Sequence, residues 1–298
     1  MKYLRNSPYF FCVLALLVLS GCAFSVPLSV PDAEEYGFAS APLEGGGLVF
    51  AALLKAPTTP VDSLIVYIEG DGRVVGFSGQ ISANPTPRRP ISWKLARQDP
   101  APAVLYLPRL GQYSEAYAAA DYRQYWTEKR FAPEIVRAMS LALDKAKARA
   151  HARQLHLIGF SGGGAVAALL AASRDDVASL ATVAGLLNHA FWTAKHNYKP
   201  LVGSLNPSDT AHSLRHIPQI HFYGKQDTII SPEISEHFLR LGAFANAQRV
   251  GVVAGHNDGW ENAWPGLLTD FLVPLRLGTT VASPHTPPRE IDFPRPHQ

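Results

Sequence analysis

The stretch that decides the fold is QLHLIGFSGGGAVAALLAAS, residues 154–173. An apolar run comes first, the pattern Gly-x-Ser-x-Gly follows at residues 159–163, and an alanine-rich segment closes the stretch. This order predicts a strand, a sharp turn and a helix, which is the layout of a nucleophile elbow. Such a turn needs small residues, and it lifts Ser161 clear of the sheet, towards a general base and beside a helix N-terminus.

The pattern by itself is weak evidence. With 23 glycines among 298 residues, about 0.1 matches to Gly-x-Ser-x-Gly are expected by chance in a chain of this composition. Residues 76–79, Gly-Phe-Ser-Gly, begin in the same way, but Gln80 stands at the fifth position and no clear strand precedes them. We therefore interpret Ser78 as a loop residue, and the surroundings of Ser161 have to support the prediction.

Strand-like and helix-like segments alternate along the chain. Mostly continuous apolar runs indicate strands that are covered on both faces; they occupy residues 48–54, 63–68, 103–107, 154–160, 179–184, 219–223 and 249–253. Helical patterns lie between them, at residues 131–150, 163–173, 232–241 and 259–272. The alternation predicts an α/β fold with a mainly parallel central sheet flanked by helices.

Two stretches depart from this alternation. Residues 71–90 contain three prolines near their end and predict a loop, followed by a short helix from Ile91. Residues 186–218 contain Trp192, His196 and Tyr198 and predict a small cap-like insertion. The three aromatic side chains either form an apolar roof over a pocket or belong to the core.

An acid and a histidine follow two later strands. Asp227 comes after the strand at 219–223, and His256 comes after the strand at 249–253. Reactive groups gather at the carboxyl ends of parallel strands, and Ser, acid, His is the chain order expected for this layout. We expect His256 to act as general base towards Ser161, and Asp227 to fix the imidazole tautomer.

Two other aspartates compete with Asp227 for the role of the acid. Asp258 lies only two residues from His256, which makes it poorly placed to orient the imidazole from another strand end. Asp209 lies in the cap-like stretch. The strand-end rule therefore favours Asp227.

An oxyanion hole needs two backbone donors. The N–H of Gly162 is expected to be one, and the turn Glu-Gly-Asp-Gly-Arg at 69–73 is expected to supply the other through the backbone of Asp71. The Asp71 carboxylate would repel a developing oxyanion, so we expect it to turn away or to pair with Arg73. An ordinary glycine-rich turn is the alternative interpretation of this segment.

Four residues are candidates for contacts with a substrate. Phe160 lies inside the elbow, and Trp192 lies in the cap-like stretch. Arg109 and Tyr113 follow the strand at 103–107 and therefore stand at a strand end, as does Gln112.

The first residues have the character of a secretory signal. Lys2 and Arg5 precede an apolar stretch from Tyr9, which runs into Leu-Ser-Gly-Cys at 19–22. Residues 19–22 resemble the bacterial lipobox, so we expect a signal peptide at 1–21 and lipid attachment at Cys22. Ala23 follows the cysteine in place of the aspartate associated with inner-membrane retention, which favours a periplasmic-face lipoprotein of the outer membrane. An uncleaved N-terminal anchor is the alternative.

Composition limits the remaining possibilities. We expect a tether at 22–43, one domain at 44–278 and a proline-rich, disordered tail at 279–298. Without residues 1–21 the chain has 25 basic and 24 acidic side chains, a net charge of +1, which argues against binding to nucleic acid. The only cysteines are Cys12 and Cys22, so the mature chain forms no internal disulfide. The oligomeric state stays open.

The elbow together with Asp227 and His256 resembles the α/β-hydrolase superfamily over about residues 45–275, and the chain looks like a bacterial lipoprotein branch of it. The resemblance implies hydrolysis without fixing a substrate, and the Glu-Gly-Asp-Gly turn departs from the superfamily's common His-Gly start. We expect a serine hydrolase that acts through an acyl-enzyme on a small or medium carboxylic ester and needs no metal or cofactor. A peptidase or thioesterase with the same triad, and a non-catalytic binding scaffold, are the alternatives.

Overall fold

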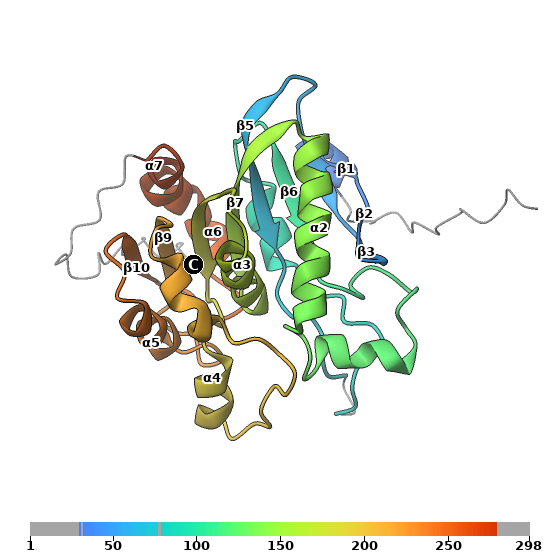
Figure 1. Cartoon of the computed structure of the whole chain (residues 1–298), viewed down its shortest axis with the longest axis vertical. Coiled ribbons are helices and arrows are strands. Elements are labelled where there is room, and N and C mark those ends of the chain that lie inside the picture. Colours follow the sequence, from blue (N-terminus) through green and yellow to red (C-terminus); the bar gives the residue numbers. More distant parts are fainter. Residues whose placement is uncertain (1–29, 31, 77–78, 279–298) are drawn as a thin grey trace, which may run out of the picture.

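The computed structural model describes residue 30, residues 32–76 and residues 79–278. Within them, eight strands form one twisted sheet in the order β1-β4-β6-β5-β7-β8-β9-β10 (Figure 1). All neighbouring strands from β6 to β10 run parallel, whereas β4 is antiparallel to both of its neighbours. The strands are β1 (Ala39–Ser40), β4 (Leu53–Lys55), β5 (Val61–Ile68), β6 (Val104–Leu107), β7 (Ala152–Phe160), β8 (Val177–Val183), β9 (Gln219–Gly224) and β10 (Ala247–Val252).

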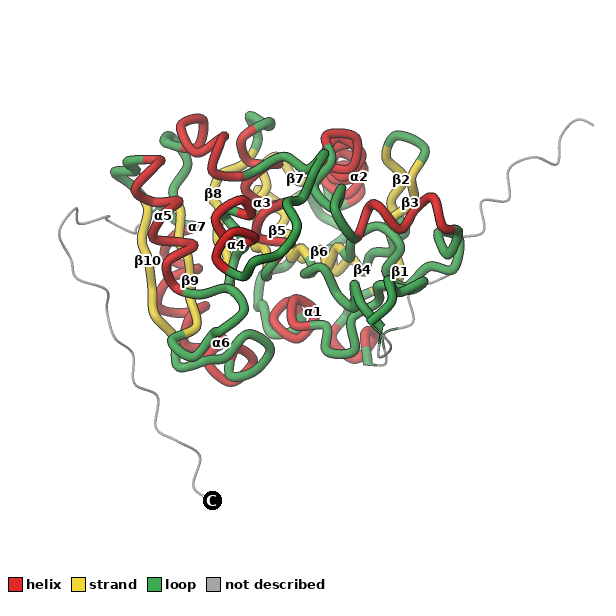
Figure 2. The backbone as a smooth tube through the Cα atoms, turned by 90° about the horizontal axis from the view of Figure 1, so that it is seen from below, coloured by secondary structure: helices red, strands yellow, loops and turns green. Residues whose placement is uncertain are grey.

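Helices cover both faces of this sheet. Figure 2 shows α2 (Pro133–Arg149) and α3 (Gly162–Ala172) on one side, and α1 (Ile91–Ala96) and α6 (Trp260–Leu267) on the other. Each side has its own apolar cluster, and α5 (Pro232–Gly242) contributes to the cluster that contains α2 and α3. The chain therefore has three layers, which confirms the predicted α/β architecture.

The central strands divide their side chains between these two clusters. In β5, Leu64, Val66 and Ile68 face α2 and α3, whereas Ile65 and Tyr67 face the opposite layer. All five are buried, because strand side chains alternate between faces and both faces are covered. This is why residues 64–68 of β5 form a continuous apolar run.

Two predicted elements are divided. The strand expected at 48–54 is separated into β3 (Leu48–Phe50), which pairs with β2 (Leu43–Gly45) in a hairpin, and β4, which joins the main sheet. The helix expected at 259–272 consists of α6, a π-helical turn η4 (Leu268–Leu272) and α7 (Val273–Arg276). The other predicted strands and helices are confirmed with small shifts of their ends.

The predicted tether is wrong for residues 32–43, which are folded onto the domain. A 3-10 turn η1 (Ala33–Tyr36) precedes β1, and Phe38 is buried against Trp93 with ring centroids 5.0 Å apart. The guanidinium of Arg97 also binds the carboxylate of Asp32 at 2.7 Å. A buried aromatic ring and a paired aspartate attach this segment to the domain.

The cap-like stretch at 186–218 has two parts. A short helix α4 (His189–Lys195) extends from the domain, whereas the 3-10 segment η3 (Pro207–Leu214) buries Ala211 and Leu214 in the core. Asn188 caps α4 by accepting the N–H of Phe191 at 3.0 Å. Only the first part therefore stands where a cap could cover a site.

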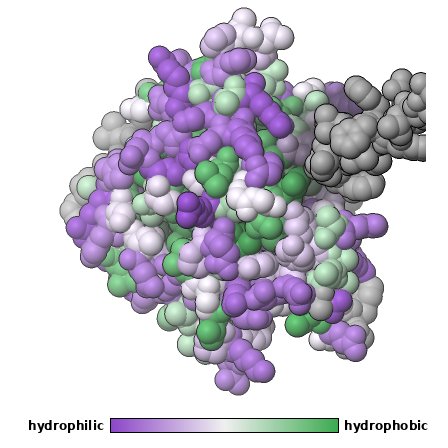
Figure 3. Space-filling view, turned by 45° about the vertical axis from the view of Figure 1, so that its right-hand side comes forward, coloured by the Kyte–Doolittle hydropathy of each residue, from purple (hydrophilic) through white to green (hydrophobic). Residues whose placement is uncertain are grey.

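Several predictions fall outside the described residues: the signal peptide, Cys22, Ser78 and the proline-rich tail. Among the helices of the described part, none combines the length and the apolar character of a membrane span. One face of the molecule shows hydrophobic side chains in separate patches among hydrophilic ones (Figure 3).

Candidate active site

Ser161 lies in a strained turn between β7 and α3. Its backbone angles are φ 51° and ψ −121°, a conformation that costs energy for any residue with a side chain. A Cβ at position 159 would lie 2.2 Å from the carbonyl oxygen of Gly163, and a Cβ at position 163 would lie 2.3 Å from the carbonyl oxygen of Ile68. Both positions therefore require glycine, which gives the Gly-x-Ser-x-Gly pattern its steric basis.

Gly163→Ala is expected to disrupt this turn. The new methyl group would press on the backbone oxygens of Ile68 and Glu69, which cannot move without shifting β5. We expect the free energy of unfolding to fall by about 3 kcal/mol, measured by denaturant titration. Gly76→Ala is the matched control, because its Cβ would meet nothing closer than the Gln80 oxygen at 3.6 Å. Equal stability of the two variants would contradict the steric argument.

The structure brings Ser161, His256 and Asp227 together from three strand ends. The Oγ of Ser161 lies 3.1 Å from Nε2 of His256, and Nδ1 of His256 lies 2.8 Å from Oδ2 of Asp227. The Asp227 side chain is fully buried and the His256 side chain is 11 % exposed. The three groups therefore form one hydrogen-bonded chain, and Ser161, at its end, is partly exposed to solvent.

Backbone groups fix the acid and the histidine in this arrangement. Oδ1 of Asp227 accepts the N–H groups of Ile229 at 2.8 Å and Ile230 at 2.9 Å, which leaves Oδ2 to face the imidazole. The indole N–H of Trp260 donates to the carbonyl oxygen of His256 at 3.1 Å. Because Asp227 and His256 are each held by groups other than the three catalytic candidates, their geometry is formed before any substrate binds.

The competing aspartates have other partners. Asp258 accepts the N–H of Gly255 through Oδ1 at 3.1 Å, so it closes the turn that carries the histidine. Asp209 lies in η3 and faces the side chain of Asn206 at 3.4 Å. Neither carboxylate contacts the imidazole of His256 among the described residues.

The turn after β5 passes over the elbow. The Asp71 carboxylate packs against Gly162, where an added Cβ would lie 2.0 Å from Oδ1. The expected pairing with Arg73 is wrong, because Oδ2 binds Arg130 at 2.6 Å and Oδ1 binds Arg109 at 3.2 Å. Burial opposes the charged form, yet the two guanidinium groups outweigh it and hold the pKa of Asp71 below its usual value. Within the described residues no acceptor contacts the backbone N–H of Asp71 or of Gly162.

Glu69 holds the start of this turn from below. It is 1 % exposed, and Oε1 accepts the N–H of Gly70 at 3.0 Å while Oε2 accepts the hydroxyl of Tyr106 at 2.9 Å. Gln112 adds a second hydrogen bond to the same turn, from Nε2 to the carbonyl oxygen of Gly70 at 2.8 Å. Burial raises the pKa of Glu69 to about 7, because the hydrogen bonds compensate only part of the lost hydration.

This raised pKa predicts a pH-dependent contribution to stability. Glu69 keeps its proton to a higher pH in the folded chain than in the unfolded chain, where its pKa is near 4.5. The folded state therefore binds more protons between about pH 4.5 and 7, and the contribution of Glu69 falls as the pH rises through that window. Relative to Glu69→Gln, which cannot ionise, the wild type should lose up to about 3 kcal/mol of stability between pH 5 and pH 8.5.

The measurement is denaturant unfolding of both proteins at several pH values. Other titrating groups are common to the two chains and cancel in the difference. A difference that does not change with pH would show that Glu69 ionises normally in the folded protein.

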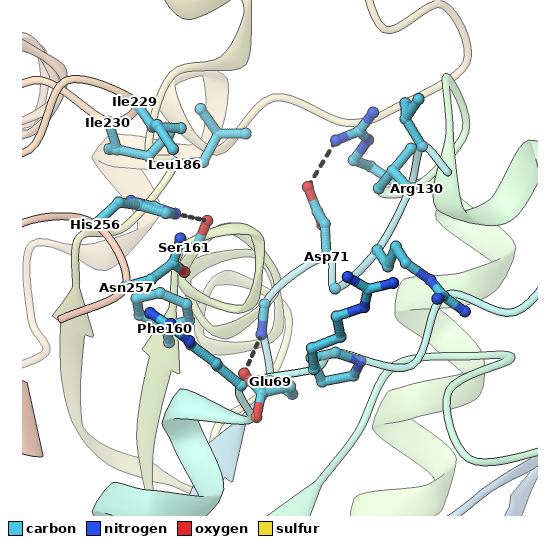
Figure 4. Close-up of a pocket in the computed structure, with 18 of the residues that line it drawn as sticks. Glu69, Asp71, Arg130, Phe160, Ser161, Leu186, Ile229, Ile230, His256 and Asn257 are labelled. Atoms are coloured by element: carbon cyan, nitrogen blue, oxygen red, sulfur yellow. Dashed lines mark hydrogen bonds and ion pairs between the residues drawn. The ribbon is translucent and has the colours of Figure 1, made fainter. Parts of the chain in front are cut away.

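A cavity of about 520 Å³ opens above Ser161. Figure 4 shows that Leu186, Ile229 and Ile230 lie on the His256 side of it, whereas Asp71 and Arg130 lie on the other side of Ser161. A volume of this size admits a small or medium organic molecule.

The candidate substrate residues divide into two groups. Phe160 and Trp192 line the cavity; the Phe160 ring lies 5.2 Å from the His256 ring, and Trp192 donates its indole N–H to the Ile229 oxygen at 2.9 Å. The prediction that Arg109 and Tyr113 contact the substrate is wrong, because neither residue lines the cavity. Arg109 is 5 % exposed and lies behind Asp71, and the Tyr113 hydroxyl faces that of Tyr106 at 3.3 Å.

Sequence reasoning missed the apolar wall and most of the arginines at the cavity. Leu186, Ile229 and Ile230 follow β8 and β9 within a few residues, so the strand-end rule applied to apolar side chains would have found them. Arg130 has no such signal, because it reaches Asp71 from a loop 59 residues further along the chain. In the described part of the chain, no three His, Cys, Asp or Glu side chains gather as metal ligands.

Comparisons with known proteins agree with this arrangement. The family described as Serine hydrolase (FSH1) matches residues 101–256, which is over half of the chain and includes all three residues of the hydrogen-bonded chain. No curated protein matches significantly.

Solved structures with the α/β-hydrolase fold are similar to this chain. Est1E from Butyrivibrio proteoclasticus has a TM-score of 0.57 at 15 % identity, covering 79 % of this chain and 98 % of that one. The Pyrococcus furiosus esterase Pf2001 has a TM-score of 0.57 at 12 % identity, covering 82 % and 95 %. A puromycin hydrolase has a TM-score of 0.58 at 18 % identity, covering 86 % of this chain and 42 % of that one. At these identities the likeness establishes the fold.

Proposed function

Because the chain belongs to the Serine hydrolase (FSH1) family, we propose that it hydrolyses carboxylic esters through an acyl-enzyme on Ser161. The observation that carries this proposal is the unbroken hydrogen-bonded chain from Ser161 through His256 to Asp227, with separations of 3.1 and 2.8 Å. The alternative of a non-catalytic binding scaffold is disfavoured, since Ser161, His256 and Asp227 are all present and hydrogen-bonded.

The roles follow from the geometry. His256 Nε2 takes the proton of the Ser161 hydroxyl as the oxygen attacks the ester carbonyl, and it returns that proton to the leaving alcohol. Asp227 holds the imidazole in the tautomer that has Nε2 free and stabilises the imidazolium. Water, activated by the same imidazole, then cleaves the acyl-enzyme and releases the acid.

The N–H groups of Gly162 and Asp71 are proposed to bind the oxyanion. Gly162 stands at the N-terminus of α3, and Asp71 stands on the turn held by Glu69 and Gln112. Because the Asp71 carboxylate is occupied by Arg130 and Arg109, its charge is compensated where a negative oxygen would otherwise be repelled.

The leaving group is the part of this proposal that a substrate panel tests. We expect 4-nitrophenyl esters of short and medium acids to be hydrolysed with a higher kcat/KM than matched acyl thioesters or aminopeptidase substrates. Higher kcat/KM on the thioesters or the amides would assign the same triad to a thioesterase or a peptidase instead.

We also propose that Cys22 anchors the protein to the membrane as a lipoprotein of the cell envelope. The support is the Leu-Ser-Gly-Cys sequence at 19–22 after a short apolar stretch; two or more acyl chains would give stable anchoring. Cys22→Ser should abolish incorporation of labelled palmitate and move the protein to the aqueous fraction, whereas Cys12→Ser should leave both unchanged. Palmitate retained in Cys22→Ser would contradict this proposal.

A further inference from the structure

The two sides of the cavity differ in chemistry. Leu186, Ile229 and Ile230 form an apolar wall next to His256 (Figure 4). Four arginines also line the cavity, namely Arg73, Arg88, Arg89 and Arg130, and of these Arg130 lies across Ser161 from the apolar wall. An ester that fills the cavity therefore contacts both hydrocarbon and guanidinium groups.

The two carboxylates at the cavity are fewer than the four guanidinium groups. Among the described lining residues only Glu69 and Asp71 are acidic. The oxygens of Glu69 face Gly70 and Tyr106, and the Asp71 carboxylate is already shared between Arg130 and the buried Arg109 behind it. The lining thus carries four guanidinium groups against two carboxylates, so its excess of positive charge depends on the arginines other than Arg130.

Arg73 and Arg89 have no carboxylate partner within the part of the chain that the structure describes. Arg73 is half-buried; one of its terminal nitrogens reaches the carbonyl oxygen of Asn84 at 3.3 Å, and its Nε is buried without any hydrogen-bond partner among the described residues. A buried guanidinium nitrogen without an acceptor is costly, so such a group is suited to an acceptor brought by a ligand.

Charge of one sign in a concave site with apolar walls raises the local concentration of oppositely charged ligands. Guanidinium groups bind carboxylates and phosphates through paired hydrogen bonds, and these bonds are stronger than those between neutral groups. The apolar wall at the same time favours a short hydrocarbon segment next to the reacting carbonyl.

We propose that the natural substrate is an ester carrying an anionic oxygen group, a carboxylate or a phosphate, which binds to Arg73 and Arg89. This inference rests on the proposed ester hydrolysis and specifies its substrate class. The anion takes no part in bond making or breaking; it positions the ester so that its carbonyl lies at Ser161.

A matched pair of substrates tests this inference. The mono-4-nitrophenyl ester of glutaric acid carries a free carboxylate, and its methyl ester has nearly the same shape without the charge. We expect the wild type to show a kcat/KM for the acid at least about tenfold above that for the methyl ester, mostly through KM, and this ratio to fall in 0.5 M salt. A phosphonate analogue of the same length identifies which anion is preferred.

Variants locate the effect. In the double variant Arg73→Gln/Arg89→Gln, the ratio of kcat/KM for the acid to that for the methyl ester should fall towards one. Each single variant should lower this ratio partially. Arg153→Gln is the control with the same loss of charge, because Arg153 is 76 % exposed and binds Asp62 away from the cavity. Its ratio should equal that of the wild type.

The outcomes separate this inference from the function on which it rests. Turnover of both esters with a ratio near one in the wild type, or with a ratio that the double variant does not change, overturns the anionic substrate and leaves the ester hydrolase intact. No turnover of either ester, together with no labelling of Ser161 by a fluorophosphonate, overturns both.

Discussion

Ser161→Ala should lower kcat/KM for every hydrolysed ester by about 10⁴- to 10⁶-fold. The variant removes the only atom that can form the acyl-enzyme, whereas the cavity and the backbone N–H groups of Asp71 and Gly162 stay in place. Ser161 also makes its one side-chain hydrogen bond to His256. Thermal stability should therefore change little, because the backbone strain at φ 51° is the same for serine and alanine.

The measurement is steady-state hydrolysis of 4-nitrophenyl butyrate with thermal unfolding as the check on folding. Ser213→Ala is the matched control, since Ser213 is exposed in η3 and remote from the cavity. Activity within tenfold of the wild type in Ser161→Ala would remove this serine from the mechanism.

Asp227→Asn should lower kcat/KM by about 10⁴-fold although it changes a single atom. The backbone N–H groups of Ile229 and Ile230 require an acceptor at Oδ1, so the new amide has to present its NH₂ group to the imidazole. Nδ1 of His256 then becomes an acceptor and Nε2 carries the proton. An imidazole in that tautomer has no lone pair to take the proton of Ser161.

Asp258→Asn separates the orienting role from the general loss of a charge near the histidine. Asp258 lies two residues from His256 and caps the turn of Gly255, without touching the imidazole. We expect its kcat/KM to stay within tenfold of the wild type. Strong loss in Asp258→Asn with near-normal activity in Asp227→Asn would transfer the acid to position 258.

Much of the framework could be predicted because each layer leaves a local signal. Where both faces of a strand are covered its residues are mostly apolar, as in the second halves of β5 and β7, and the elbow needs glycine at two contacts with neighbouring backbone. Since parallel strands end at one edge of the sheet, Asp227 and His256 could be placed near Ser161 from the positions of their strands alone.

The remainder depends on contacts between segments far apart in the sequence. Nothing near Asp71 identifies Arg130 as its partner, and Arg73, two residues away, was the nearer candidate. The same limit applies to the tether: Tyr36 and Phe38 stand among polar and small residues, and both contact Trp93 of α1. Local patterns predict elements, whereas pairings across the fold decide which loops form the cavity.

The central claim is that Ser161 is the nucleophile activated by His256, and mapping of a covalent adduct tests it most directly. The purified protein is treated with a fluorophosphonate, digested, and analysed by mass spectrometry, with Ser161→Ala and His256→Gln in parallel. We predict one adduct, located on Ser161, which is absent from the alanine variant and slowed by at least about 10³-fold in His256→Gln. An adduct on another residue, or one that persists in Ser161→Ala, would contradict the account.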